Sequence, residues 1–447
     1  MSKLKIAFVP IARTTFDIAF AQEKANSARE KLRKHIGTVV GPDELITDMD
    51  GIEKIIAELK EAALDTIVVF QATFADSTMI ITLAEGVDTP LFLWAVPEAH
   101  TGGRLRLNSF CGINLAGHAM TRAGYRYGYV FAAPDDPSAT KKITTFVRAG
   151  HARRLLGNAR LGRIGENPIG FETCLFNPEE LKQRFGIDVI QYSLQDDIFP
   201  KVRQIPTNRT TDVANALSKK IDKLDEMDAE AVQASLGTYL RLQEISKNED
   251  IQGFAVRCWP EFFTDLGCAA CGAMSMLSDE MIPCSCEADV HGNITQMMLQ
   301  WLSDEPAFLT DMVSVDKESD AMVLWHCGLA PLSMADPEAE KSATIHSNRQ
   351  LPLLMEFPLK PGQVTAARLT RVSDELELVI GSGRVLRSSK IFSGTSGLLK
   401  FDRPINQVVD DILGKGLEHH IAITYGNHIE ELRILAKLLD LPLIELT

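Results

Sequence analysis

The chain has 447 residues, of which 24% are charged and 45% are hydrophobic, and this composition excludes a disordered or fibrous protein. Its 46 lysine and arginine residues against 60 aspartate and glutamate residues leave a net charge of −14, which argues against a nucleic-acid partner or an anionic membrane surface. No apolar run approaches the roughly 18 residues of a membrane span, and no signal-peptide pattern opens the chain. We therefore expect a cytoplasmic protein of about two to three domains.

The first third of the chain alternates strand and helix patterns. Short apolar or β-branched runs predict buried strands, and segments with an apolar stripe at helical spacing predict amphipathic helices. The predicted strands cover residues 5–12, 65–70 and 90–96, and the predicted helices cover residues 17–35, 51–64, 75–84 and 113–123. Strands that alternate with helices of this length are typical of a parallel sheet covered on both faces.

A second α/β segment follows a basic helix around residues 147–156. The predicted elements are strands at residues 159–165, 251–262 and 281–292 and helices from residue 178 onward and at residues 219–246, 264–277 and 294–302. Glu261 and Asp289 lie just beyond two of these strand ends, and a helix follows each of them. Loops at the carboxyl ends of parallel strands are where such sheets bind ligands.

The pattern changes after about residue 323. Short alternating runs between glycine turns predict antiparallel β-structure, at residues 351–357, 364–372, 375–383 and 384–389. The end of the chain predicts helices at residues 405–414 and 428–439 and strands at residues 420–425 and 443–446. We therefore predict two Rossmann-like parallel-sheet α/β domains, 1–155 and 156–323, followed by a mostly antiparallel β C-terminal domain, 324–447.

Polar side chains interrupt the apolar strand ends at three places, Glu261, Asp289 and the pair His419-His420. Two carboxylates and one imidazole form a ligand set that suits Mn²⁺, Mg²⁺, Co²⁺ or Zn²⁺ with open positions for substrate oxygens. The structural alternative is that Glu261 and Asp289 cap helices. Adjacent strand residues face opposite ways, so we expect at most one histidine of the pair to point into a given site.

Five cysteines fall between residues 258 and 286, and they offer a competing metal site. Cys268-x-x-Cys271 and Cys284-x-Cys286 have the spacing of a four-cysteine structural zinc site. Cys268 and Cys271, however, lie inside a predicted helix among small residues, where cysteines also pack as small apolar side chains. Packing is the simpler interpretation of this cluster.

The sequence resembles the L-fucose isomerase/L-arabinose isomerase superfamily. The resemblance is carried by five segments in order: residues 108–130 (NSFCGINLAGHAMTRAGYRYGYV), 147–172 (VRAGHARRLLGNARLGRIGENPIGFE), 258–262 (CWPEF), 284–299 (CSCEADVHGNITQMML) and 416–446 (GLEHHIAITYGNHIEELRILAKLLDLPLIEL). The two α/β domains and the β-rich third domain of that superfamily match the break points above.

This resemblance implies a divalent-metal aldose–ketose isomerase of carbohydrate metabolism that works through a cis-enediol. Carried over by position, Glu261 and Asp289 are the acid/base pair and metal ligands, and His420 is the third ligand. The implied metal is Mn²⁺, with Co²⁺, Mg²⁺ or Zn²⁺ as alternatives. The implied substrate is a pentose, a deoxyhexose or a C6-modified hexose, such as fucose, arabinose or sulfoquinovose, and the implied assembly is a homo-oligomer such as a hexamer.

Further residues are candidates for substrate binding. By resemblance, His326 matches a position that is a histidine ligand in arabinose isomerases, with core packing as the ordinary alternative. His419 is a further candidate, and the alternative for the pair His419-His420 is a hydrogen-bonded histidine at a strand start. Arg13, Arg104 and Arg106 belong to predicted loops of the first domain and suit an anionic C6 group, with surface solubility as the alternative. Two other functions stay open at this point: a non-catalytic sugar-binding sensor on the same framework, and a protein stabilised by zinc on its cysteines.

Overall fold

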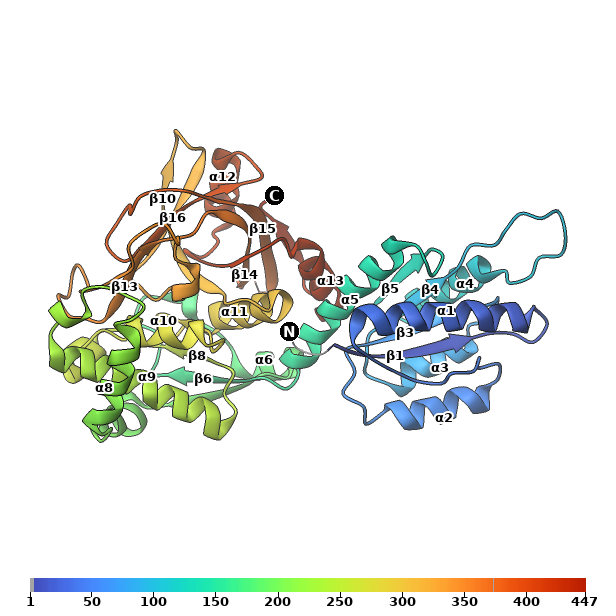
Figure 1. The fold of residues 1–447 in the computed structure, drawn as a ribbon, viewed down its shortest axis with the longest axis horizontal. Helices are drawn as coiled ribbons and strands as arrows, with labels where there is room; N and C mark the ends of the chain where they lie inside the picture. The colour runs from blue at the N-terminus through green and yellow to red at the C-terminus, as the bar shows by residue number, and fades with distance from the viewer. Residues whose placement is uncertain (1–3, 373) are drawn as a thin grey trace. The chain divides into compact units, whose positions relative to one another are not determined.

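The computed structural model describes residues 4–372 and 374–447, which form two compact units. Unit 1 comprises Met1–Leu155 with Glu430–Asp440, and unit 2 comprises Leu156–Ile429 with Leu441–Thr447. Two parallel α/β sheets and one mostly antiparallel sheet confirm the predicted fold class (Figure 1). The boundary at residue 323 stays a prediction. Within the described residues, no helix has both the length and the apolar character needed to cross a membrane.

Unit 1 is built on a parallel five-stranded sheet in the order β2-β1-β3-β4-β5. The strands are β1 (Lys5–Ile11), β2 (Thr38–Val40), β3 (Thr66–Gln71), β4 (Leu91–Ala95) and β5 (Tyr127–Phe131). The helices are α1 (Ile18–Ile36), α2 (Met49–Leu59), α3 (Thr78–Gly86), α4 (Ser109–Arg122), α5 (Pro137–Leu156) and, from the far end of the chain, α13 (Ile429–Leu439). This order makes a doubly wound sheet whose order reverses at β1.

Helices cover both faces of this sheet, because its central strands are apolar on both sides. Helices α1 and α5 share one core with Phe8, Phe70 and Trp94, and α13 packs Ile434 and Leu438 against the same core. Helices α2, α3 and α4 share the core on the other face. The near-continuous apolar runs of the predicted strands follow from this double burial.

Strand β5 is absent from the sequence-based prediction, and its place in the sheet explains why. It is an edge strand that pairs only with β4, and Val130 is its one buried residue. Gly128 within it leaves room for the rings of Phe92 and Phe146, which a Cβ would meet at 2.5 Å. A half-exposed strand with a central glycine carries neither an apolar run nor a clear alternation.

Unit 2 begins with a parallel four-stranded sheet in the order β7-β6-β8-β9. Its strands are β6 (Arg160–Ile164), β7 (Asp188–Tyr192), β8 (Gly253–Val256) and β9 (Cys284–Ser285). Its helices are α6 (Pro178–Phe185), α7 (Phe199–Arg203), α8 (Thr207–Leu217), α9 (Ala229–Glu249), α10 (Cys271–Asp279) and α11 (Val290–Ser303). The predicted helix at residues 219–246 was wrong over residues 219–228, because the Asp228 side chain accepts from Ala231 N at 2.8 Å and starts α9 there.

The remaining strands form a nine-stranded sheet in the order β12-β13-β16-β11-β10-β17-β14-β15-β18. They are β10 (Phe308–Asp316), β11 (Ala321–His326), β12 (Ser342–Thr344), β13 (Leu354–Pro358), β14 (Gly362–Thr370), β15 (Glu377–Leu386), β16 (Thr395–Phe401), β17 (His420–Tyr425) and β18 (Leu443–Glu445), with α12 (Ile405–Lys415) before β17. Because β15 also pairs with β16, the central strands close into a barrel.

Two of the predicted antiparallel runs, residues 375–383 and 384–389, are one strand rather than two. The glycines that suggested a turn lie inside β15. A Cβ on Gly383 would lie 2.9 Å from the Cα of Phe401 on β16, so this glycine permits close approach of two strands. A glycine in a closely packed strand and a glycine in a turn look alike in sequence.

Asp65 precedes β3 and is a buried charge that ties three segments of unit 1 together. It accepts hydrogen bonds from His151 Nδ1 at 2.9 Å, Arg154 Nε at 2.8 Å and Lys5 N at 2.7 Å. Burial alone would raise the pKa of Asp65, but the hydrogen bonds from His151, Lys5 and Arg154 lower it below its ordinary value. Asp65 therefore stabilises the fold only while it is ionised.

We predict that Asp65→Asn lowers the free energy of unfolding at pH 7 by about 2–4 kcal/mol, because it leaves buried donors without their carboxylate. A lowered pKa means that the contribution is present at neutral pH and is lost as the pH falls through the folded-state pKa. Urea denaturation from pH 7 to pH 3 should show the wild type converging on the variant. The control is Asp88→Asn, since the exposed Asp88 pairs with Arg153 at 2.8 Å on the surface; an equal loss in both variants would contradict the role of Asp65.

Candidate active site

Asp289 lies at the junction between the parallel sheet and the barrel of unit 2, directly before α11. Its side chain accepts from Gly292 N at 2.9 Å and so caps the helix, which confirms the structural alternative for this residue. The two residues before it, Glu287 and Ala288, have φ values of 58° and 55°. The left-handed conformation costs conformational energy in a non-glycine residue, and here two such residues follow one another. Backbone of this kind persists where surrounding contacts enforce it, and it is common at functional sites.

The second oxygen of Asp289 binds two further groups. Arg368 on β14 donates to Asp289 Oδ2, and His420 Nδ1 donates to the same oxygen at 2.9 Å. Burial would raise the pKa of Asp289, but the Arg368 charge and the His420 hydrogen bond hold it far below its ordinary value. Asp289 is therefore a buried carboxylate with a hydrogen-bond donor from the protein on each of its oxygens.

His420 begins β17 and turns its other nitrogen toward two more carboxylates. Its Nε2 lies 3.3 Å from Asp311 Oδ1 and 3.4 Å from Glu287 Oε2. Burial would lower the pKa of His420, but its hydrogen bonds to Asp289 and Asp311 raise it to about 10. Three carboxylates thus surround one imidazole and favour a positive charge at this position.

His326 ends β11 and completes this group. Its ring stacks on that of His420 with 6.0 Å between centroids. Its Nδ1 accepts from Cys327 N at 2.9 Å, while its Nε2 is buried and has no hydrogen-bond partner in the described part of the chain. We call Glu287, Asp289, Asp311, His326 and His420 the histidine–carboxylate cluster.

His419 also contacts the cluster, against the expectation that only one histidine of the pair would do so. His419 Nε2 lies 3.6 Å from Glu287 Oε2, close to the 3.4 Å of His420 Nε2. The alternation argument fails because β17 begins at His420, so His419 belongs to the preceding loop and is free of the strand pleat. His419 remains partly exposed, with 40% of its side chain accessible.

Two members of the cluster, Glu287 and Asp311, were missed by the sequence-based prediction. The sequence did point to Glu287, because it lies two residues before Asp289 in the same motif. The direction of its side chain could not be predicted, because Glu287 lies in a loop with φ above zero. Asp311 lies inside β10, a strand that the prediction did not contain. Only the pairing of β10 with β17, which sets Asp311 opposite His420, brings it into the cluster.

Glu261 forms an ion pair of its own in the structure. It receives a hydrogen bond from Arg257 Nε at 2.7 Å and makes no side-chain cap. It is in none of the groups of three or more metal-binding side chains that the described residues form, which all contain members of the cluster. Partial burial would raise the pKa of Glu261, but the Arg257 hydrogen bond lowers it, so the carboxylate is ionised at neutral pH. Its role as a metal ligand stays a prediction.

An aromatic wall flanks the cluster on the side of β8. Trp259 Nε1 donates to Glu287 Oε1 at 3.3 Å, so the indole fixes one oxygen of this carboxylate. Phe171 packs edge-on against Trp259 at 5.6 Å and against His419 at 6.2 Å. Aromatic rings beside polar groups are the surfaces on which proteins hold rigid, partly apolar ligands.

The cysteines do not assemble as their spacing suggested. Cys286 and Cys327 group with His326, and Cys271 Sγ lies 3.1 Å from Cys327 Sγ. Cys268 and Cys284 are buried and belong to none of the metal-binding groups within the described residues. The four-cysteine arrangement expected from Cys268, Cys271, Cys284 and Cys286 is therefore absent among those residues.

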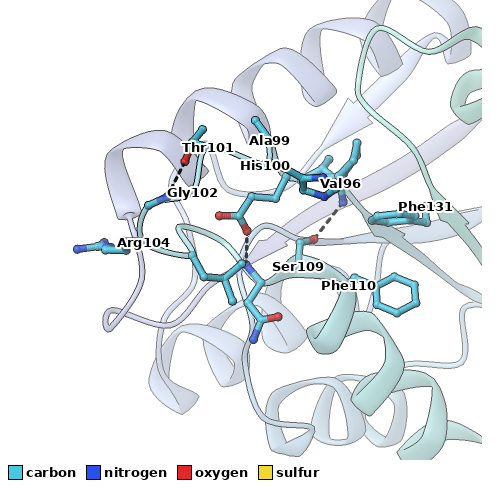
Figure 2. Close-up of a pocket in the computed structure, with 14 residues that line it drawn as sticks. Val96, Ala99, His100, Thr101, Gly102, Arg104, Ser109, Phe110 and Phe131 are labelled. Atoms are coloured by element: carbon cyan, nitrogen blue, oxygen red, sulfur yellow. Dashed lines mark hydrogen bonds between the residues drawn. The ribbon is translucent and has the colours of Figure 1, made fainter.

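The three predicted arginines lie in unit 1, whereas the cluster lies in unit 2. Arg106 forms an ion pair with Asp17, with 2.9 Å between its Nε and the carboxylate. Its guanidinium also stacks on the ring of Phe20, 3.8 Å from the ring centroid. Arg13 and Arg104 are exposed, and Arg104 lines a cavity of about 420 Å³ at the carboxyl end of β4 (Figure 2). Their role in substrate binding stays a prediction.

The cavity in Figure 2 holds its own carboxylate. Glu98 accepts from Leu107 N at 3.0 Å and Asn108 N at 2.9 Å, just before α4. Burial would raise the pKa of Glu98, but these backbone hydrogen bonds lower it, so the side chain is an anion in the lining of the cavity. Phe110 and Phe131 form the apolar side of the cavity, with ring centroids 5.0 Å apart. Glu98 thus already accepts from the backbone N–H groups of Leu107 and Asn108 at this cavity.

Comparisons with known proteins define the class. A sequence profile of the fucose/sulfoquinovose isomerase N-terminal domain matches residues 7–156. Sulfoquinovose isomerases from Priestia megaterium and Alkalicoccus urumqiensis are 30% and 31% identical to this chain, and each match covers 99% of both chains. The chain is thus an aldose–ketose isomerase of carbohydrate metabolism. It belongs to the fucose/sulfoquinovose isomerase family, which confirms the resemblance found in the sequence.

We predict that Asp289→Asn destabilises the protein by about 3 kcal/mol, because it disturbs a buried cap and a buried ion pair at once. Glu261→Gln makes the same chemical change at a partly exposed ion pair and should cost less than about 1 kcal/mol. Urea denaturation of both variants and the wild type measures the two losses. Equal losses would mean that Asp289 is not the structural centre of this junction.

Proposed function

We propose that the protein is a divalent-metal-dependent aldose–ketose isomerase whose active centre is the histidine–carboxylate cluster. The observation that carries this proposal is the set of three carboxylates, Glu287, Asp289 and Asp311, gathered around the imidazole of His420. Such a set stabilises a cation, and a hard divalent ion with open positions can take up two adjacent sugar oxygens.

The residues present fit a metal ion. Glu287 Oε2 is a buried acceptor atom without a hydrogen-bond partner in the described residues, and Glu287 forms a group of potential ligands with His419 and His420. Buried polar atoms are rarely left unsatisfied, so this oxygen beside two imidazoles supports a cation site. Glu287, His419 and His420 would hold the cation, and Mn²⁺ is the first candidate, with Co²⁺, Mg²⁺ and Zn²⁺ as alternatives.

Asp289 has a different place in this proposal. Its hydrogen bond to His420 Nδ1 leaves Nε2 free to face the metal, and carboxylates in this outer position orient histidine ligands and raise their basicity. The sequence-based alternative is that Asp289 is itself a ligand and, with Glu261, the acid/base pair. In that alternative the ion would compete at Asp289 with the hydrogen bonds from Arg368, Gly292 and His420.

A bound divalent ion would supply Lewis acidity to the C1 and C2 oxygens of the open-chain sugar. The protein's own carboxylates move the protons: one removes the proton from C2 and returns it to C1 through a cis-enediol, while another passes a proton between the two oxygens. Glu261 and Glu287 are both ionised and lie at the ends of neighbouring strands, so we assign these transfers to them. Trp259 holds Glu287 in position and excludes water from one side.

The substrate that we propose is sulfoquinovose, a hexose with a sulfonate at C6. The proposal is supported by the full-length match to sulfoquinovose isomerases from several bacteria. Fucose and arabinose are the neutral alternatives. A non-catalytic sugar sensor is the alternative from another class, and it would need neither a cation site nor ionised carboxylates beside it.

We predict that the protein with Mn²⁺ converts sulfoquinovose to its ketose faster than it converts fucose, arabinose or glucose. A panel of these aldoses, with ketose formation followed by NMR, measures the rates. Chelation with EDTA should abolish turnover, and added Mn²⁺ should restore it, because the cation stabilises the enediolate charge. If no aldose is converted although the protein binds Mn²⁺ and sugar, the protein is a sensor and the proposal fails.

A matched pair of variants decides which carboxylate binds the metal. We predict that Glu287→Gln abolishes stoichiometric Mn²⁺ binding, whereas Asp289→Asn retains it with about 10–100-fold weaker affinity. Metal titration calorimetry and metal analysis measure both values at pH 7.5, with Cys268→Ser as the control for the cysteine site. Loss of Mn²⁺ binding in D289N but not in E287Q would restore Asp289 as the ligand, and loss of zinc in C268S would support the cysteine alternative.

A further inference from the structure

We propose that Arg349 and His346 form a binding site for the tetrahedral oxyanion at C6 of the sugar, and this inference rests on the proposed function of the cluster. Both residues belong to a tight turn between β12 and β13. His346 N donates to Leu351 O at 2.9 Å, and Gln350 N donates to His346 O at 2.7 Å, which closes the turn. The turn is also anchored to the start of α10, because Gly272 N donates to Leu353 O at 2.8 Å.

The Arg349 guanidinium is held by aromatic rings rather than by a carboxylate. It lies 4.8 Å from the ring centroid of Trp259 and 5.3 Å from that of Phe263. Stacking of this kind fixes the plane of the guanidinium and leaves its N–H groups at the edge free to donate. Arg349 forms no ion pair within residues 4–372 and 374–447, although acidic residues outnumber basic ones in this chain by 60 to 46.

His346 packs against the guanidinium at the same place. Asn348 N donates to His346 Nδ1 at 3.3 Å, and Arg349 Nη1 lies 3.3 Å from His346 Nε2. His346 is buried, with 7% of it exposed, so the imidazole holds one edge of the guanidinium in place. An anionic oxygen would accept from the remaining N–H groups of Arg349.

Arg349 and the histidine–carboxylate cluster share one wall. The indole of Trp259 carries Arg349 on its ring, and its Nε1 donates to Glu287 Oε1 at 3.3 Å. The reacting C1 and C2 of an open-chain hexose are at one end of the molecule, and the C6 group is at the other. One aromatic side chain therefore separates a cation site for C1 and C2 from a cationic site for C6, which is the order that a C6-sulfonated aldose requires.

Sulfonate and phosphate share the chemistry that this site recognises, namely three oxygens and a negative charge. The sulfonate is the source that the proposal favours, because it carries a single charge and needs only the few donors found here. A sugar 6-phosphate carries nearly two charges at pH 7.5 and would leave part of that charge without a partner. A neutral 6-deoxyhexose has no anionic group for Arg349 to bind.

The experiment compares kcat/KM for sulfoquinovose, glucose 6-phosphate and 6-deoxyglucose in the wild type and in Arg349→Gln. We expect the ratio of sulfoquinovose to 6-deoxyglucose to fall about 10–100-fold in R349Q, mainly through KM, because a charge-assisted hydrogen bond to a buried anion is lost. Arg349→Lys keeps the charge but not the planar guanidinium, so its ratio of sulfoquinovose to 6-deoxyglucose should lie between those of the wild type and R349Q. Arg387→Gln is the matched control, since Arg387 pairs with Asp336 and Glu338 on the surface.

A second measurement separates this inference from the proposed isomerase activity. Methyl α-sulfoquinovoside cannot open to an aldose, so its affinity by calorimetry reports binding without turnover. We expect wild-type binding that weakens about 10-fold or more in R349Q while the circular dichroism spectrum and the Mn²⁺ affinity stay the same. An isomerase that shows no change of ratio or affinity in R349Q, or a fall in R104Q instead, overturns the assignment to Arg349. If wild-type turnover is absent while R349Q still weakens glycoside binding, the isomerase proposal fails and the anion site stands.

Discussion

The buried hydrogen bond between Asp289 and His420 is the interaction on which the site depends. It joins the loop before α11 to the first residue of β17, and Arg368 from β14 binds the same carboxylate. Asp289 therefore compensates one buried cation, orients one imidazole and caps one helix. A buried charge with that many partners has little freedom to move, so the two sheets of unit 2 fix the direction of His420 Nε2 before any ligand arrives.

The site divides its carboxylates by environment. Asp289 is fully enclosed, Glu287 has one oxygen bound by Trp259 and one without a hydrogen-bond partner in the described residues, and Glu261 is partly exposed beside Arg257. Groups of the same chemical type thus differ in what they can do: one orients a side chain, one can bind a cation, and one can accept a proton. Trp259 contacts side chains of both charges. Its Nε1 donates to the carboxylate of Glu287, and its ring packs against the guanidinium of Arg349.

The fold was predictable where burial leaves a periodic trace in the sequence. Strands β3 and β4 are buried on both faces and were predicted within a residue or two, as were α1 and α12. The failures occurred where a local signal had two meanings. Edge strand β5 carries a single buried residue, and the glycines of β15 serve close strand packing rather than a turn. Only the neighbouring strand distinguishes such cases.

The sequence by itself determined the class of fold, the superfamily and the two short motifs that contain Glu287, Asp289 and His420. The tertiary structure decided which of these side chains meet and what each can do. Asp311 reaches His420 through the pairing of β10 with β17, and Arg349 reaches Trp259 from a turn about 90 residues away in the chain. Motifs record residue types and short spacings, whereas the direction of a side chain and the partners that satisfy it depend on strand register and packing, which residues distant in the chain supply.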